Sequence, residues 1–165
     1  MTTIKALITT MRPRQWLKNT IIFAALVFDR QLSTGNWPAV LRTFLGFVIF
    51  CLLSGVVYII NDIADIDADQ RHPIKKKRPL ASGELSAKIA KGFSIITLAL
   101  IIPLSFLLSP AFAIVALSYL ILNLAYSNWI KNIPLLDVFA IALGFVLRIL
   151  AGITLIEVAR FSPWL

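Results

Sequence analysis

The chain has 165 residues, of which 59% are hydrophobic and 15% are charged, and its net charge is +8. An average soluble domain is about 45–50% apolar and about 25% charged. The mean hydropathy of +0.86 is too high for a protein with a polar, water-facing surface. These values exclude a soluble globular domain and a disordered chain, and they predict an integral membrane protein.

The charge and the rare residue types narrow the function further. In a membrane protein an excess of Lys and Arg reports orientation and contact with phosphate or anionic lipid, so we expect no nucleic-acid partner. The single cysteine, Cys51, excludes an internal disulfide and a Cys-rich metal site. The single histidine, His72, excludes a metal site built from several histidines within this chain.

Apolar stretches near the length of a membrane-crossing helix, about 20 residues, divide the sequence. Five segments qualify or nearly qualify: 16–28, 39–60, 89–108, 111–130 and 133–156. Ser109 and Pro110 are the only break between the third and fourth segments, which predicts a tight helical hairpin. The sequence therefore predicts an all-α, polytopic transmembrane helical bundle that forms a single domain over residues 1–165.

The two ends of the sequence carry separate signals. The first apolar segment follows a charged leader and is not followed by an Ala-x-Ala site, so we expect a retained anchor and not a cleaved signal peptide. At the other end, Pro163 and Trp164 are typical of the start of another interfacial helix. We therefore expect the chain to be truncated at its C-terminus.

Lys and Arg residues are divided unevenly between the two sides of the membrane. With a cytoplasmic N-terminus, 12 of the 16 lie on the cytoplasmic side, three lie outside, and Arg148 lies within the fifth segment. An excess of Lys and Arg in cytoplasmic segments is the usual sign of orientation. The sequence thus predicts a multi-pass cell-membrane protein whose N-terminus and 71–88 loop are cytoplasmic.

Four acids in eight residues follow directly on the second apolar segment. On a continuous helix Asp62, Asp65 and Asp69 fall within an arc of about 60°, Tyr58 extends this stripe into the membrane, and Asp67 lies on the far side. Three carboxylates on one arc repel one another unless a cation lies between them, and Mg²⁺ prefers such hard oxygen ligands together with phosphate oxygens. We predict that these three aspartates are catalytic and hold Mg²⁺; the alternative is a solvated acidic helix end.

A basic loop follows the acidic stretch. An EF-hand is excluded, because Gln70 and Lys76 stand where that loop needs Gly and Glu. Five Lys and Arg in eight residues beside a Mg²⁺ site suit a multiply charged phosphate whose leaving charge must be stabilised. Arg78 is the expected direct ligand, because Pro79 stiffens its backbone, and Lys75 belongs to the same cluster. The alternative is a cluster that sets topology and touches anionic headgroups.

Other polar residues gather near the same membrane face. Lys18 and Asn19 lie in a basic, Trp-containing leader that is typical of a membrane anchor as well as of a phosphate site. Tyr126 and Lys131 close the fourth segment at the cytoplasmic face, where they can reach the same site. We interpret His72 as a loop residue and not as a catalyst.

Arg148 lies in the middle of the fifth segment, where a charge is costly and normally faces a polar interior. It shares a helix face with Asp137, 11 residues earlier. A structural ion pair between the two and a functional role for Arg148 are both open.

With these residues identified, the sequence resembles the UbiA superfamily of intramembrane prenyltransferases. The motifs are Asn61-Asp62-x-x-Asp65-x-x-x-Asp69, Arg78-Pro79-x-x-x-Gly83 and Tyr126-Ser127-x-x-x-Lys131. Within the superfamily it is similar to decaprenyl-phosphate phosphoribosyltransferases, on Arg12-Pro13-Arg14-Gln15-Trp16-x-Lys18-Asn19 and Arg71-His72-Pro73-x-Lys75-x-x-Arg78-Pro79. The likeness extends from Arg12 to Gly152.

The resemblance implies a fold of nine helices, five of them expected here, around a lipid-open cavity with a polar cytoplasmic cap. It also implies a second Asp-rich motif in a C-terminal half, whereas after Asp137 this sequence has one further acid, Glu157. We therefore expect the 165-residue chain to be inactive by itself. We expect the following residues to bind substrate or phosphate: Lys18, Asn19, Tyr58, Asn61, Lys75, Arg78, Tyr126, Lys131 and Arg148.

The implied reaction of the closer subgroup is a Mg²⁺-dependent transfer of 5-phosphoribose from phosphoribosyl diphosphate to a polyprenyl (decaprenyl) phosphate. In the broader family a prenyl group moves from a prenyl diphosphate to an aromatic or quinone-precursor acceptor, and this is the alternative. The surplus of cations on one face favours the phosphate-rich reaction. A transporter subunit is a remote alternative, because it needs acids deep in a span, whereas these acids stand at a span end.

Overall fold

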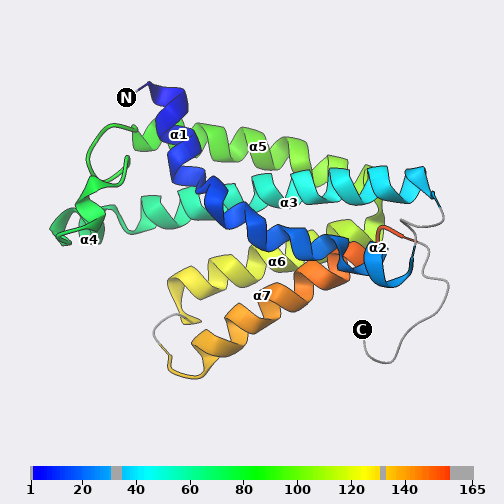
Figure 1. Ribbon diagram of the computed structural model, residues 1–165. Coiled ribbons are helices and arrows are strands. Elements are labelled where there is room, and N and C mark those ends of the chain that lie inside the picture. The colour runs from blue at the N-terminus through cyan, green and yellow to red at the C-terminus, as the bar shows by residue number, and fades with distance from the viewer. Residues whose placement is uncertain (1, 31–34, 131–132, 157–165) are drawn as a thin grey trace.

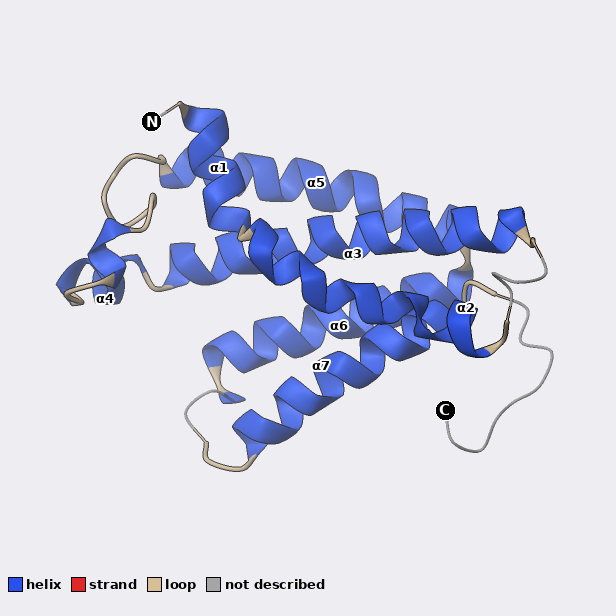
Figure 2. Ribbon diagram, in the orientation of Figure 1, coloured by secondary structure: helices blue, strands red, loops and turns tan. Residues whose placement is uncertain are grey.

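The computed structural model describes residues 2–30, 35–130 and 133–156, and every regular element in this part of the chain is helical (Figures 1 and 2). In chain order the elements are α1 (Thr3–Met11), the 3₁₀ helix η1 (Pro13–Phe23), α2 (Ala24–Phe28), α3 (Trp37–Ala64), α4 (Ile66–Arg71), the 3₁₀ turn η2 (Lys75–Lys77), α5 (Ala87–Leu108), α6 (Pro110–Asn128) and α7 (Leu136–Ile153). The predicted all-α transmembrane bundle is confirmed.

Four of these helices are long and apolar enough to cross a membrane: α3, α5, α6 and α7. Their starts follow ordinary capping rules. The Asn36 side chain accepts a hydrogen bond from the Ala39 amide at the start of α3, and Ser109 caps the Phe112 amide at the start of α6. Pro110 occupies the first turn of α6, where its missing N–H has no cost. The predicted hairpin between the third and fourth apolar segments is confirmed, because α5 ends at Leu108 and α6 begins at Pro110.

The first apolar segment differs from the expected α-helical span. Residues 16–28 lie in η1 followed by the short α2, so this stretch is not among the four long α-helices. A 3₁₀ helix rises about 2.0 Å per residue against about 1.5 Å in an α-helix, so the 16 residues of η1 and α2 extend over roughly 30 Å. That is about the thickness of a bilayer core. The same 16 residues would be shorter as a continuous α-helix and would not reach across it.

This segment runs between α3 and α7 (Figure 1). A side chain at Gly152 of α7 would collide with the backbone oxygen of Ile22, so the two segments touch backbone to backbone. Ile22 is itself fully buried in the main core. That core joins η1, α3, α5, α6 and α7 around the ring of Phe50, which packs in tilted contacts against the rings of Phe112 and Tyr119.

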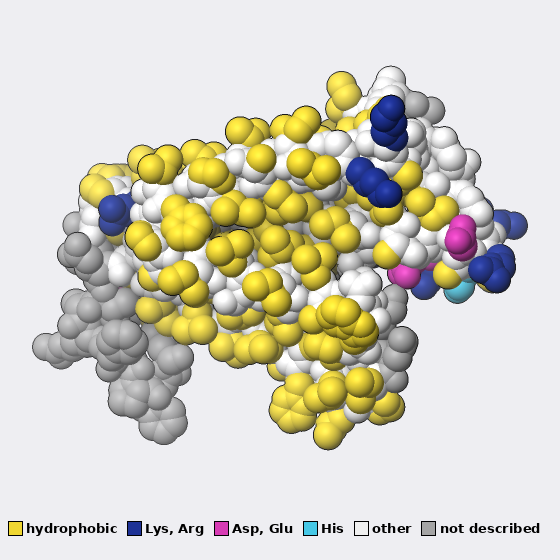
Figure 3. Space-filling view, turned by 180° about the vertical axis from the view of Figure 1, so that it is seen from behind, with side chains coloured by type: hydrophobic (Ala, Val, Ile, Leu, Met, Phe, Trp, Pro, Cys, Tyr) yellow, Lys and Arg dark blue, Asp and Glu magenta, His cyan; other side chains and the backbone are white. Residues whose placement is uncertain are grey.

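Charged side chains are concentrated at one end of the bundle. In Figure 3 apolar side chains cover the middle of the visible face, while acidic residues, the histidine and most Lys and Arg lie at the end that carries α4. This is the end where α1 and the 71–86 loop also lie (Figure 1). The four spans and the apolar belt identify a multi-pass membrane protein with a polar cap at one end.

Candidate functional site

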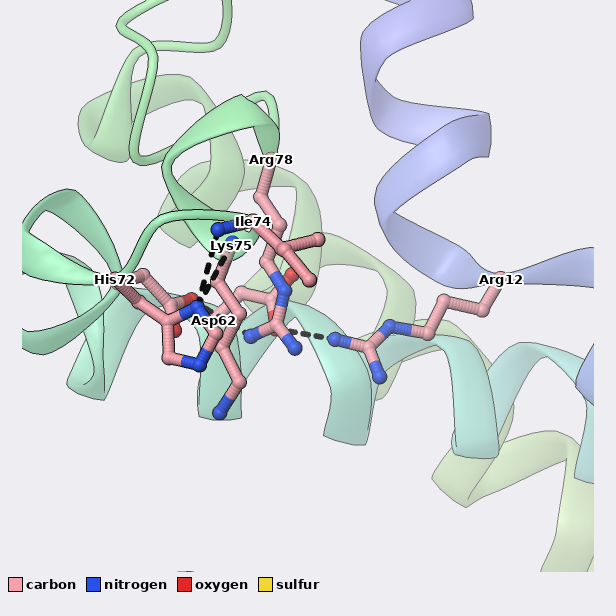
Figure 4. Close-up of polar contacts among 7 residues, drawn as sticks. Arg12, Asp62, His72, Ile74, Lys75 and Arg78 are labelled. Atoms are coloured by element: carbon pink, nitrogen blue, oxygen red, sulfur yellow. Dashed lines mark hydrogen bonds and ion pairs between the residues drawn. The ribbon is translucent and has the colours of Figure 1, made fainter.

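Two arginines from distant parts of the sequence converge on Asp62 near the end of α3 (Figure 4). Nη2 of Arg12 lies 2.7 Å from Oδ1 of Asp62, and Nη1 of Arg78 lies 3.2 Å from the same oxygen. The second arginine also reaches Asp69, with 2.6 Å between Nη1 of Arg78 and Oδ2 of Asp69. Both carboxylates are 4% exposed, so this is a buried, charge-balanced cluster and not a surface ion pair.

A small apolar core holds these charges in register. Ala6 and Met11 of α1 pack with Ile59 of α3 and with Leu80 and Leu85 of the loop. Three of the four charged residues lie close in sequence to a member of this core. Met11 precedes Arg12, Ile59 lies almost one turn before Asp62, and Leu80 follows Arg78 by two residues. Burial of the apolar residues therefore fixes where the three charged side chains meet.

Gly55 lies where α1 approaches α3. A Cβ at this position would lie 3.1 Å from Cβ of Met11, so Met11 would have to move by a few tenths of an ångström to admit a side chain. The chain then leaves α1 through Arg12, whose backbone is left-handed with φ 53°. Such a conformation is rare for a residue with a side chain, and here it precedes the rigid Pro13.

The loop that carries Arg78 is ordered by its own hydrogen bonds. Nδ1 of His72 accepts hydrogen bonds from the backbone N–H groups of Ile74 and Lys75, at 3.2 and 3.3 Å (Figure 4). Beyond Arg78, the Leu85 amide donates to the Pro79 carbonyl at 2.8 Å. His72 thus contributes to loop structure, in agreement with its interpretation from the sequence.

The acidic stretch does not form the continuous helix on which the predicted arc depends. Helix α3 ends at Ala64, Asp65 is the junction residue with φ −97° and ψ 8°, and α4 begins at Ile66. Asp62 and Asp69 nevertheless come together through Arg78, while Asp67 is exposed as expected. Within the described residues no three acidic, His or Cys side chains lie close enough to form a metal site as they stand.

The residues present at this junction still fit a hard cation. Oδ1 of Asn61 is buried and has no hydrogen-bond partner in the described structure, which leaves an amide oxygen available. Asp62 and Asp69, which Arg78 joins, offer carboxylate oxygens near the same helix end, and the half-buried Asp65 lies between them in sequence. Carboxylate and amide oxygens are the donor types that Mg²⁺ accepts.

A pocket of about 330 Å³ opens beside the ion pairs, and we call it the cap pocket. It is lined by Thr9, Thr10, Arg12, Asp62, Ile74, Lys75, Lys77, Arg78 and Pro79. Four of these side chains are cationic, which suits a ligand with several negative charges.

A second pocket of about 130 Å³ lies deeper between η1, α3, α6 and α7, and we call it the inner pocket. It is lined by Lys18, Tyr58, Tyr119, Leu122, Asn123, Tyr126, Ala140, Ile141, Gly144, Phe145 and Arg148. Its described lining contains two cations and no carboxylate. Tyr58 connects the two pockets, because its ring lies 4.8 Å from the guanidinium of Arg12.

Arg148 is bound entirely by neutral groups within the described part of the chain. Its Nε donates to Oδ1 of Asn19, its Nη1 to the Gly144 carbonyl and its Nη2 to the Tyr119 hydroxyl, each at 2.8 Å. Nδ2 of Asn19 in turn lies 3.2 Å from the Ser54 hydroxyl oxygen. Asn19 is fully buried and Arg148 is 8% exposed, so this network is a fixed part of the bundle interior.

The ion pair between Asp137 and Arg148 that the sequence left open is not formed. Two positions 11 residues apart share a helix face but stand about 16 Å apart along the axis. Asp137 instead accepts a hydrogen bond of 2.8 Å from the Tyr126 hydroxyl. Arg148 therefore retains a positive charge in the bundle without a carboxylate partner among the described residues.

The candidate residues from the sequence thus divide between two places. Lys75 and Arg78 line the cap pocket with Asp62, whereas Lys18, Tyr58, Tyr126 and Arg148 line the inner pocket. Asn19 lines neither pocket but accepts a hydrogen bond from Arg148, and Asn61 precedes Asp62 in the sequence. Lys131 lies outside the described residues.

Sequence reasoning missed Arg12 and Tyr119 as site residues. The signal for Arg12 was present, because Arg12-Pro13 repeats the Arg78-Pro79 pair that singled out Arg78. No comparable signal marks Tyr119, since an aromatic residue in an apolar helix is indistinguishable from a core residue until its partners are known.

Comparisons with known proteins agree with this architecture. Residues 20–165 match the UbiA prenyltransferase family. The chain is 42% identical over 164 residues to the uncharacterized protein y4nM of Sinorhizobium fredii, covering 98% of this chain and 31% of that protein. It is 34% identical over 148 residues to a decaprenyl-phosphate phosphoribosyltransferase of Corynebacterium glutamicum, covering 88% of this chain and 45% of that protein.

Among solved structures, a UbiA homolog from Archaeoglobus fulgidus, bound to DMAPP and Mg²⁺, superimposes with a TM-score of 0.76 at 24% identity. The match covers 95% of this chain and 56% of that protein. The chain therefore spans between about a third and about a half of the length of the curated relatives described above. By its sequence match and its helical architecture, this chain belongs to the UbiA prenyltransferase family.

Proposed function

We propose that the protein is a Mg²⁺-dependent membrane transferase that moves 5-phosphoribose from phosphoribosyl diphosphate to a polyprenyl phosphate such as decaprenyl phosphate. The observation that carries this proposal is the presence of two separate cationic pockets, one at the polar end of the bundle and one deeper between its helices. Phosphoribosyl transfer brings together a donor with three phosphates and an acceptor with one, so it needs two places for anions. The name of the Corynebacterium glutamicum relative supports the same assignment.

In this proposal the donor occupies the cap pocket. Lys75, Lys77 and Arg78 bind the diphosphate and stabilise the charge that develops on it as it leaves. Asn61, Asp62, Asp65 and Asp69 would hold Mg²⁺, which when bound neutralises the diphosphate and makes it a better leaving group.

The acceptor phosphate occupies the inner pocket, where Lys18 and Arg148 bind it and the apolar bundle surface accommodates its polyprenyl chain. One phosphate oxygen attacks the anomeric carbon of the ribose as the bond from that carbon to the diphosphate breaks. The products are the ribosylated lipid phosphate and free diphosphate. The Arg148 network contributes by holding its guanidinium in place before the lipid arrives.

Prenyl transfer to an aromatic or quinone-precursor acceptor is the second candidate, and the likeness to a homolog bound to DMAPP and Mg²⁺ favours it. The same aspartates would serve a prenyl diphosphate. A transporter has less support, because four of the seven described acids lie at or just after the end of α3 and do not line a path through the bundle.

The test supplies membranes that carry a full-length protein containing this chain with ribose-labelled phosphoribosyl diphosphate, decaprenyl phosphate and Mg²⁺. A labelled lipid that requires Mg²⁺ is expected. Lys18→Gln should raise the KM for the lipid phosphate, whereas Lys75→Gln should raise the KM for the donor. No labelled lipid, together with product from a labelled prenyl diphosphate and an aromatic acid, would transfer the assignment to prenyl transfer.

A further inference from the structure

In the ion pairs around Asp62, two carboxylates are matched by two guanidiniums before any ligand binds. Two carboxylates, Asp62 and Asp69, face two guanidiniums, Arg12 and Arg78, at 2.6 to 3.2 Å. Arg12 and Arg78 share a single oxygen of Asp62, and Arg78 also holds Asp69. A divalent cation that used these carboxylates would have to displace both arginines, because like charges at such distances repel strongly in a low-dielectric site.

The displaced arginines have no other acid to move to within the cap pocket. Besides Asp62, its described charged lining consists of Arg12, Lys75, Lys77 and Arg78. A metal ion alone would therefore leave the four cations of the cap pocket without a carboxylate in its described lining. A diphosphate supplies the missing negative charge, and its oxygens accept bidentate hydrogen bonds from guanidinium groups.

We propose that Arg12 makes the binding of the divalent cation and of the diphosphate interdependent, with Arg78 as its partner. In the free protein Arg12 and Arg78 form ion pairs with the aspartates. When the metal binds the carboxylates, the two arginines bind the diphosphate instead. Each ligand then raises the affinity for the other, as linkage requires. This inference rests on the metal site of the proposed function, and it applies to a phosphoribosyl or a prenyl donor alike.

Arg12 is built for such an exchange. Its backbone is fixed by the buried Met11 before it and by Pro13 after it, while its side chain is 34% exposed and lines the cap pocket. The guanidinium lies over the Tyr58 ring at 4.8 Å, which supports the charge in more than one position along the ring face. A side-chain rotation suffices to move it from Asp62 into the pocket, and no helix has to shift.

The test measures binding to the purified protein in detergent, with Mn²⁺ in place of Mg²⁺ and inorganic diphosphate in place of the donor. Equilibrium dialysis with radioactive Mn²⁺ gives the metal affinity alone, and dialysis with ³²P-labelled diphosphate at saturating Mn²⁺ gives the anion affinity. Arg12→Gln is expected to bind Mn²⁺ alone about tenfold more tightly and diphosphate about tenfold more weakly, within the usual range of coupling between sites.

Arg14→Gln is the matched control. Arg14 carries the same charge two residues after Arg12, but its side chain is exposed and lines neither pocket. It should leave both affinities within about twofold of the parent, and Arg12→Lys should fall between the parent and Arg12→Gln. If Arg12→Gln binds Mn²⁺ alone no better than the parent, the inference is wrong even where phosphoribosyl transfer is established. Failure of the parent to bind Mn²⁺ with or without diphosphate overturns the metal site and this inference together.

Discussion

Nε of Arg148 in α7 donates a hydrogen bond of 2.8 Å to Oδ1 of Asn19 in η1, which lies 129 residues earlier in the chain. This bond joins the 3₁₀ segment to the last described helix in the bundle interior. Loss of this bond affects the two side chains differently. Arg148 loses one of three hydrogen-bond acceptors without Asn19, whereas Asn19 loses the donor to its side-chain oxygen without Arg148.

We expect Asn19→Ala to lower the free energy of unfolding by about 1–3 kcal/mol, the usual cost of leaving a buried polar group unpaired. Arg148→Ala should cost at least as much, and the double variant should show a coupling of about 0.5–3 kcal/mol. Thermal unfolding in mild detergent gives all four corners of this cycle. Thr20→Ala next to Asn19 is the control, because the Thr20 hydroxyl is exposed; strictly additive losses would show that the bond has no energetic role.

The aspartates near the end of α3 should differ in their effect on turnover. In a complete protein that contains this chain, Asp62→Ala, Asp65→Ala and Asp69→Ala should each abolish Mg²⁺-dependent product, whereas Asp67→Ala should retain most of it because this side chain faces solvent. Product formation at saturating substrate over a series of Mg²⁺ concentrations is the measurement. Equal losses at all four positions would contradict the distinction between the three residues and Asp67.

The backbone contact between η1 and α7 predicts a large effect of one methyl group. Gly152→Ala places a Cβ against the Ile22 carbonyl, and because a backbone atom cannot rotate away, we expect a loss of about 1–3 kcal/mol. Gly92→Ala in α5 is a matched control, since nothing lies within 4 Å of its Cβ position. It should gain about 0.5–1 kcal/mol from better helix propensity, and a stable Gly152→Ala variant would mean that η1 does not lie against α7.

The orientation in the membrane can be tested at two exposed positions. In a Cys51→Ser background, Ser82→Cys in the loop should react with an impermeant maleimide only after the membrane is opened, because the basic loop is expected in the cytoplasm. Trp37→Cys at the start of α3 is 75% exposed and should react from the outside of intact cells. The reverse labelling pattern would invert the topology.

Much of the bundle was predictable because membrane insertion depends on local properties. Runs of apolar residues determine which segments cross, and prolines and capping residues determine where α6 and α3 begin. The concentration of charge at one end follows from the same pattern, since charged residues are excluded from the apolar belt. These features depend on neighbours in the sequence and need no knowledge of which helices pack together.

The aspartate motif and Arg78 were also predictable, but their arrangement was not. Helical geometry treated residues 62 to 69 as one helix, whereas the chain turns at Asp65 and Arg78 bridges the two sides of the turn. The Arg-Pro pair marks Arg12 in the sequence, but only the packing of Met11 in α1 against α3 brings Arg12 to Asp62.

The sequence alone therefore determined that this is a helical membrane protein with an acidic and basic cap, because hydropathy, helix breaks and charge are properties of contiguous residues. Only the tertiary structure shows that most of the first segment is a 3₁₀ helix between α3 and α7, and that Arg148 binds Asn19 and not Asp137. Angular position on a helix can be read from residue numbers, but which side chains meet depends on the height and packing of neighbouring helices. For the same reason only the folded bundle brings Arg12 and Arg78 to a single carboxylate oxygen of Asp62.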